Sequence, residues 1–83
     1  MPDRDHEIID HIDRLMAEEH ALEGRHHEGE GLSEDERARM RTLEVQLDRC
    51  WDLLRQRRAR RNAGQDPDLA VERDADTVEG YRQ

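Results

Sequence analysis

The sequence predicts an all-α protein built as an antiparallel hairpin of two helices. Two amphipathic stretches, each with one stripe of apolar residues at helical spacing, are separated by a short glycine-rich segment. A helix must bury such a stripe, and a short connection favours antiparallel packing of neighbouring helices. The hairpin is expected to cover residues 1–64 and to be coiled-coil-like, because the longer stripe follows a heptad pattern.

The first helix is predicted to run from about residue 5 to residue 23. Acidic residues occupy its first turns, where the helix dipole favours negative charge, and Gly24 is expected to end it. Glu19 falls at a stripe position. It either lies beside the core, within reach of Arg39 or Arg41, or acts as a polar residue that sets the register. The apolar stripe consists of Ile8, Ile12, Leu15 and Leu22.

Residues 24–32 contain three glycines in nine positions, which marks a loop. The second helix, from about residue 34 to residue 63, opens with a capping box in which Ser33 and Glu36 each bond the other's backbone N–H. Gly64 is expected to end this helix, and Pro67 beyond it prevents its continuation. The heptad seam of this helix consists of Met40, Leu43, Leu47, Cys50 and Leu54.

Charge alternates along the chain, which carries a net charge of −8 at pH 7. Residues 37–63 hold nine Arg against three acids, whereas the segments on both sides are acidic. Residues 65–83 show no helical period and are predicted to form an acidic, partly ordered tail. The basic segment therefore has neutralising groups within its own molecule.

A chain of 83 residues, of which 33% are hydrophobic, has little apolar surface to bury in a lone hairpin. Four apolar residues lie just off the two seams and offer a second apolar face. We expect two hairpins to associate through this face into a homodimeric four-helix bundle. The candidate interface residues are Ile9, Met16, Trp51 and Leu53.

The strongest functional candidate is a cluster of five arginines that spreads around the end of the second helix. The cluster can pair with acids of the same molecule, bind an acidic surface of a protein partner, or contact nucleic-acid phosphates. Nucleic acid is the least favoured partner, because the whole chain is acidic and no aromatic residue is interleaved for stacking. The five residues are Arg55, Arg57, Arg58, Arg60 and Arg61.

Other reactive side chains give no pattern of catalysis or cofactor binding. Cys50 is the only cysteine, and its seam position predicts a core residue. His26 and His27 lie in a glycine-rich segment without further ligands at metal-binding spacing. We therefore predict that the protein is not an enzyme and has no catalytic, cofactor-binding or metal-binding residues.

The same features predict a cytoplasmic protein. A single cysteine excludes an internal disulfide and fits a reducing compartment. No apolar run reaches membrane-spanning length, and the N-terminus has no signal-peptide apolar region. We expect no contact with a membrane.

Several segments resemble a family of short actinobacterial proteins described as domain of unknown function 2630. They are residues 43–61, with the run Cys50-Trp51-Asp52-Leu53-Leu54-Arg55-Gln56-Arg57-Arg58-Ala59, and residues 63–67, 78–81 and 18–20. The likeness covers nearly the whole chain, although the His- and Gly-rich loop differs. It implies a cytoplasmic helical protein and supplies no activity, catalytic residue or ligand.

We expect a non-enzymatic interaction protein that presents its Arg-rich helix end and acidic tail to a protein partner. One alternative is a transcription-associated regulator that inserts an acidic hairpin tip into a polymerase channel, where its carboxylates could hold Mg²⁺. The other alternative is a nucleic-acid-binding module that uses residues 55–61. The acids of the tip are Glu28, Glu30, Glu34, Asp35 and Glu36.

Overall fold

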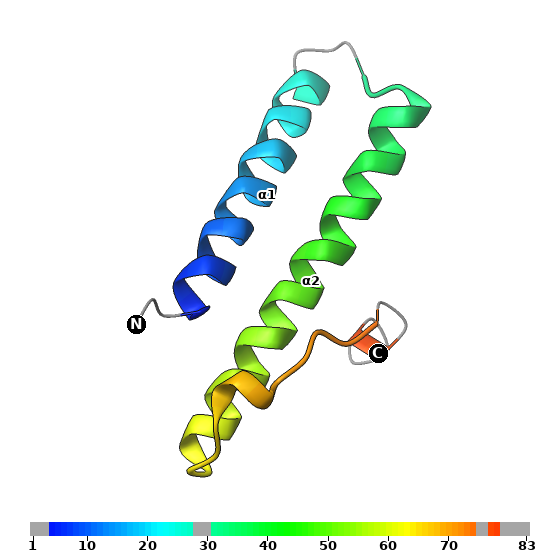
Figure 1. Cartoon of the computed structure of the whole chain (residues 1–83). Helices are drawn as coiled ribbons and strands as arrows, with labels where there is room; N and C mark the ends of the chain where they lie inside the picture. The colour runs from blue at the N-terminus through cyan, green and yellow to red at the C-terminus, as the bar shows by residue number, and fades with distance from the viewer. Residues whose placement is uncertain (1–3, 28–30, 75–76, 79–83) are drawn as a thin grey trace.

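The computed structural model describes residues 4–27, 31–74 and 77–78, with only the backbone given for residues 26 and 27. Its elements are helix α1 (Arg4–His27), helix α2 (Glu34–Asn62) and the short 3-10 helix η1 (Pro67–Leu69). Helices α1 and α2 lie side by side and antiparallel, and the chain after α2 turns back along that helix (Figure 1). The protein is thus the all-α hairpin that the sequence predicts, with a further segment packed on it.

The core lies along the line where the two apolar stripes meet. Leu43 is completely buried and Ile12 is 2% exposed, which places the centre of the hairpin at these residues. Ile8, Leu22 and Leu54 pack against the core from its two ends. The seams read from the sequence are therefore the packed faces of both helices. The buried cluster consists of Ile12, Leu15, Leu43, Leu47 and Cys50.

Helix α1 continues to His27, so the prediction that Gly24 ends it is wrong. Glycine ends a helix readily where a left-handed backbone is needed, but positive φ angles occur only at Gly31 and Gly64 among the described glycines. A helical glycine costs only about 1 kcal/mol relative to alanine. The ion pair between Arg25 and Glu36 joins the extra turn to the start of α2.

Both ends of α2 follow from local sequence. Glu36 N–H donates to Ser33 Oγ over 3.1 Å, and Ser33 N–H donates to Glu36 Oε1 over 3.0 Å. At the other end Gly64 adopts a φ of 73°, and its N–H donates to the Arg61 carbonyl over 3.1 Å. The Gln65 N–H donates to the Arg60 carbonyl over 2.8 Å, which completes a Schellman motif.

Residues 66–74, here called the strap, contain η1 and run back along α2 (Figure 1). Two side chains of α2 hold the strap by its backbone: Gln56 Nε2 donates to the Val71 carbonyl and Arg49 Nε to the Arg73 carbonyl, both over 2.9 Å. Val78, just beyond the strap, is 4% exposed. Because backbone carbonyls make these contacts, side-chain periodicity could not predict the packing.

Two glycine substitutions should change stability in opposite directions. Gly24→Ala is expected to raise the free energy of unfolding by about 0.5–1 kcal/mol, because Gly24 is helical and open space surrounds its Cβ position. Gly64→Ala should lower it by about 1–2 kcal/mol, because φ is +73° there although the space is equally open. Urea denaturation at one protein concentration measures both, and a shift of the same sign for both variants would contradict the backbone conformations assigned to these glycines.

Candidate functional site

The arginine cluster divides into buried and exposed members. The heptad spacing of the α2 seam continues beyond Leu54 to positions 57 and 61, so Arg57 and Arg61 face α1. Arg57 is only 5% exposed, and Arg60 is half-buried and donates to Gln65 Oε1 over 3.3 Å. Arg55 and Arg58 are exposed. Only part of the predicted cluster is therefore available to a partner.

Arg57 joins α1, α2 and the strap. Its guanidinium pairs with Asp5 of α1 through Nε and with Asp68 of η1 over 2.9 Å, and it also donates to the Pro67 carbonyl over 3.2 Å. Arg61 binds the second oxygen of Asp5 over 2.7 Å. This placement corrects the expectation that Arg57 is a surface contact for a partner: the residue is buried, and its Nε and Nη1 donate within the molecule.

Hydrogen bonds shift the pKa values of this junction in the direction that stabilises both charges. Arg61, and then Arg57, lower the pKa of the Asp5 carboxyl below its ordinary value. Asp5, and then Asp68, raise the pKa of the Arg57 guanidinium. Both shifts favour the charged forms of Asp5 and Arg57.

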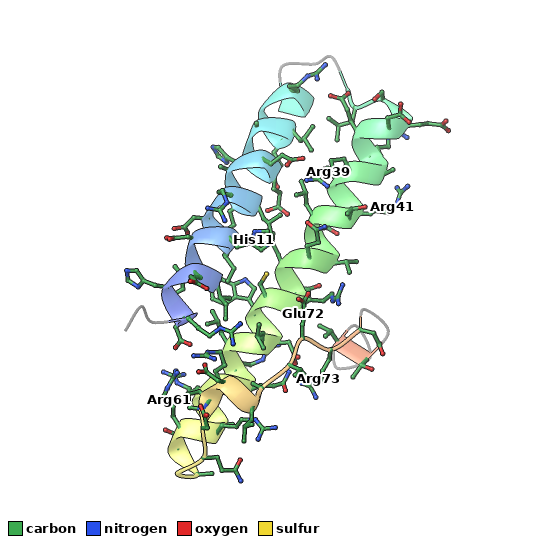
Figure 2. The ribbon with its side chains drawn as sticks, in the orientation of Figure 1. His11, Arg39, Arg41, Arg61, Glu72 and Arg73 are labelled. Atoms are coloured by element: carbon green, nitrogen blue, oxygen red, sulfur yellow. The ribbon has the colours of Figure 1, made fainter. Side chains whose placement is uncertain are left out.

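Asp52 anchors the strap on the side of α2 that faces away from the seam. The residue is 1% exposed, and Arg73 of the strap donates to it from two nitrogens, with Nε at 2.8 Å from Oδ2. Gln56 adds a hydrogen bond of 3.0 Å, and Figure 2 shows Arg73 on the part of the strap that lies beside α2. The Arg73 hydrogen bonds are the main reason why the pKa of Asp52 is lowered. The sequence did not reveal this pair, because nothing in the tail marks Arg73 as a partner of α2.

Cys50 lies at the edge of an apolar hollow of about 170 Å³ between α1, α2 and the strap. Burial, followed by the charge of Glu72, raises the pKa of its thiol. Cys50 is therefore a protonated core thiol at neutral pH, because neither influence favours the thiolate that a nucleophile needs. Leu53 and His11 line the same hollow.

The structure separates Leu53 from the other three residues of the predicted dimer interface. Leu53 is half-buried and faces the strap side, where it lines hollows with Ile8 and Glu72. Trp51 lines a different hollow, of about 260 Å³, together with Met16. Residues two positions apart in a helix lie about 200° apart around its axis, so Trp51 and Leu53 cannot share a face.

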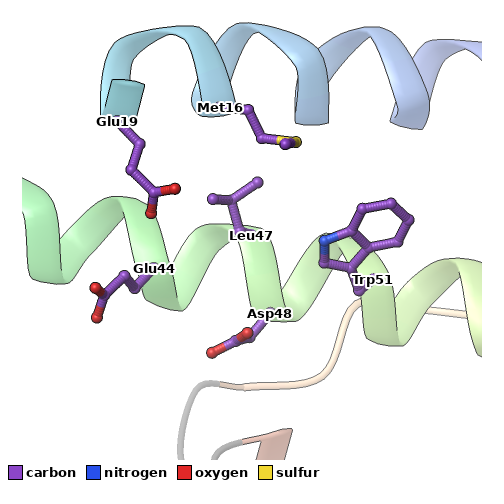
Figure 3. Close-up of a pocket in the computed structure, with 6 residues that line it drawn as sticks. All are labelled: Met16, Glu19, Glu44, Leu47, Asp48 and Trp51. Atoms are coloured by element: carbon purple, nitrogen blue, oxygen red, sulfur yellow. The ribbon is translucent and has the colours of Figure 1, made fainter. Parts of the chain in front are cut away.

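The surface around Trp51 combines apolar and charged side chains. Ile9, Met16 and Trp51 are 43%, 49% and 45% exposed. Figure 3 shows Met16 and Leu47 pointing toward each other across the two helices, with Trp51 beside them. We call this surface the Trp51 face; it consists of Ile9, Met16, Glu19, Glu44, Asp48, Trp51, Arg55 and Arg58.

Charge on the Trp51 face is sorted along α2. The acids line the hollow on the side of Trp51 nearer the hairpin loop (Figure 3). Arg55, Arg58 and Arg61 line a second hollow of about 290 Å³ with Trp51, toward the end of α2. Exposed apolar side chains thus lie between an acidic and a basic end.

The hairpin tip uses part of its acidic charge internally. Glu36 belongs to the capping box and pairs with Arg25, while Glu34 and Asp35 are exposed. The two other acids of the predicted tip, Glu28 and Glu30, and the side chains of His26 and His27 lie outside the described part of the chain.

The expected partner of Glu19 is corrected by the structure. Arg39, which Figure 2 shows between the two helices, pairs with Glu18 over 2.8 Å instead of with Glu19. Within residues 4–25, 31–74 and 77–78, no three His, Cys, Asp or Glu side chains are grouped as metal ligands.

These features define a short helical hairpin that is closed by its own C-terminal segment. None of the described helices is both long and apolar enough to cross a bilayer. Residues 4–83 match the family described as "Protein of unknown function (DUF2630)", and the chain belongs to this family.

Relatives in two mycobacteria agree with this assignment. Uncharacterized proteins of Mycobacterium tuberculosis and Mycobacterium bovis are each 54% identical to the chain over 78 residues. The matched region covers 93% of this chain and 88% of each relative. No solved structure matches the chain. The chain is therefore similar in sequence over nearly the full length of these actinobacterial proteins.

Asp52→Asn is expected to lower the free energy of unfolding by about 1.5–3 kcal/mol at pH 7, because it removes the charged acceptor of Arg73. Since the folded-state pKa of Asp52 is lowered below 3.8, its contribution is complete above about pH 5 and is lost as pH falls through the folded-state value. The difference between wild type and variant should therefore shrink in acid. Urea denaturation at a series of pH values measures this difference.

Asp10→Asn is the matched control, because Asp10 is exposed on α1. It should change stability by less than about 0.5 kcal/mol. An Asp52→Asn effect that stays constant from neutral to acid pH would contradict the assigned ion pair.

Proposed function

We propose that the protein is a non-enzymatic interaction protein of the cytoplasm that binds another polypeptide through the Trp51 face. The observation that carries this proposal is the exposure of Ile9, Met16 and Trp51 by 43–49% on one surface. Protein interfaces combine an apolar centre with a polar rim, and tryptophan and arginine are enriched among the residues that dominate binding energy. The Trp51 face has this composition.

The Arg-rich helix end contributes to binding through its exposed members. Arg55, whose side chain is 67% exposed, and Arg58 lie beside Trp51, whereas Arg57 serves the fold. We assign Arg55 and Arg58 to a partner that carries acidic groups around an apolar anchor. Arg61 lines the same hollow as Arg55 and Arg58 and can add longer-range attraction, whereas Arg60 lies two residues from Arg58 and so on the other side of α2.

In this proposal the acidic tail pairs with arginines of α2, although its charge alone would suggest that it binds a partner. Asp68 pairs with Arg57, and Glu72 pairs with Arg49 over 3.2 Å. These described tail acids neutralise α2 and are not the ones offered to a partner. The proposal therefore assigns binding to the helices and closure of the hairpin to the strap.

Two observations favour a protein partner over the other classes considered. The buried Cys50 thiol has a raised pKa, which supports a structural role for Cys50 over a role as the nucleophile of an enzyme. Glu19, Glu44 and Asp48 share the face with the exposed arginines, and their charge opposes a phosphate backbone.

The proposal is tested by placing a photo-reactive amino acid at position 55 in cells of the native host and illuminating them. We expect polypeptide adducts from position 55, because Arg55 lies on the Trp51 face. Position 14 is the matched control: Arg14 is exposed on α1, two residues from Met16 and so on the other side of that helix. Mass spectrometry identifies the adducts. Equal or absent labelling at both positions would contradict the proposed function.

A further inference from the structure

We infer that the partner of the Trp51 face is a second copy of this chain, docked with its α2 antiparallel to the first α2. The inference rests on the proposed function, because it names the occupant of the same face. It follows from the order of charges along α2, which is complementary to itself when the helix direction is reversed.

Five residues of α2 form a second heptad stripe beside the core seam. Glu44, Asp48, Trp51, Arg55 and Arg58 follow one another at spacings of four, three, four and three. Such spacing keeps side chains on one side of a helix and is the pattern by which helices pack together. All five line the two hollows of the Trp51 face. The stripe therefore provides a continuous surface for another helix.

The stripe is balanced around Trp51. Glu44 lies seven residues before it and Arg58 seven residues after it, or about 10.5 Å along the axis in each direction. Asp48 and Arg55 lie three residues before and four after. Both residues before Trp51 are acidic and both residues after it are basic, so the centre of the stripe is also its centre of charge symmetry.

An antiparallel pair of α2 helices related by a twofold axis at Trp51 sets each of these four charged residues against opposite charge. Glu44 faces the partner's Arg58, Asp48 lies near the partner's Arg55, and symmetry repeats both contacts. A parallel pair would place each acid beside its own copy. The next stripe positions outward, Arg41 and Asn62, would face one another across the pair and add no ion pair.

A second twofold arrangement, in which α2 packs on the partner's α1, fits less well. Its axis runs parallel to the helices and keeps each residue at its own level along the hairpin. Glu19 of α1 and Glu44 of α2 line the same hollow and so lie at one level. That arrangement would bring like charges together, which is unfavourable at an interface.

The apolar residues of the face provide the attraction that the charges orient. Ile9 and Met16 are seven residues apart on α1 and so flank the stripe on the same side of the hairpin as Trp51. A second copy that covers Ile9, Met16 and Trp51 would remove their exposed apolar surface from water, which favours association. The ion pairs at both ends then fix the register and the direction of the helices.

Charge reversal at the outer positions tests the pairing. Sedimentation velocity at low salt should find wild-type dimers at micromolar concentration, and Glu44→Arg or Arg58→Glu alone should weaken self-association on the order of tenfold or more. An equal mixture of the two variants should regain wild-type affinity as a heterodimer, and the double variant E44R/R58E should regain it as a homodimer. Both positions are exposed, and circular dichroism checks that the variants fold.

Arg14→Glu, on the other side of α1, is the matched control and should leave self-association unchanged. A wild type that stays monomeric, or single variants that are weakened but not rescued by mixing, would overturn the antiparallel dimer. The cross-links from position 55 separate this failure from that of the proposed function. If the wild type is monomeric but position 55 forms adducts with another protein, the dimer is contradicted and the proposed function stands. If the wild type is monomeric and forms no adducts, both are contradicted.

Discussion

The structure depends on Arg57. Among the described residues of α2, it is the one that bonds to both α1 and η1. A buried charge costs desolvation energy unless hydrogen bonds satisfy it, and here Asp5, Asp68 and the Pro67 carbonyl do so. The position belongs to the heptad seam, where an apolar residue would complete the core. At this end of the hairpin, charge pairing has taken the place of apolar packing.

Helix α2 therefore serves three surfaces at once. One side packs on α1, the side with Asp52 receives the strap, and the stripe through Trp51 faces solvent. Each surface uses a different interaction: apolar burial, buried ion pairing, and an apolar strip between opposite charges. A chain of this size has few apolar residues, so a single helix that packs on several sides makes efficient use of them.

The sequence predicted those features that arise from local or periodic patterns. Leu43, Leu47 and Cys50 could be assigned to the core because heptad spacing specifies a helix face, and the Ser33–Glu36 box marks a helix start. The strap could not be predicted, because its main contacts are made by backbone carbonyls and by Arg73, whose partner lies 21 residues away. Trp51 was assigned correctly to an exposed position, but Leu53 was grouped with it although helix geometry turns the two apart.

The position of the strap after both helices affects the order in which the protein can be completed. Asp52 finds Arg73 21 residues later, and Arg57 finds Asp68 11 residues later. Because a chain is synthesised from its N-terminus, the two helices leave the ribosome before the groups of the strap that neutralise them. Until residues 66–74 are released, α2 carries an aspartate without its main partner on one side. The nascent hairpin is thus an incomplete fold, and a chain that terminates prematurely before residue 73 lacks the arginine that Asp52 requires.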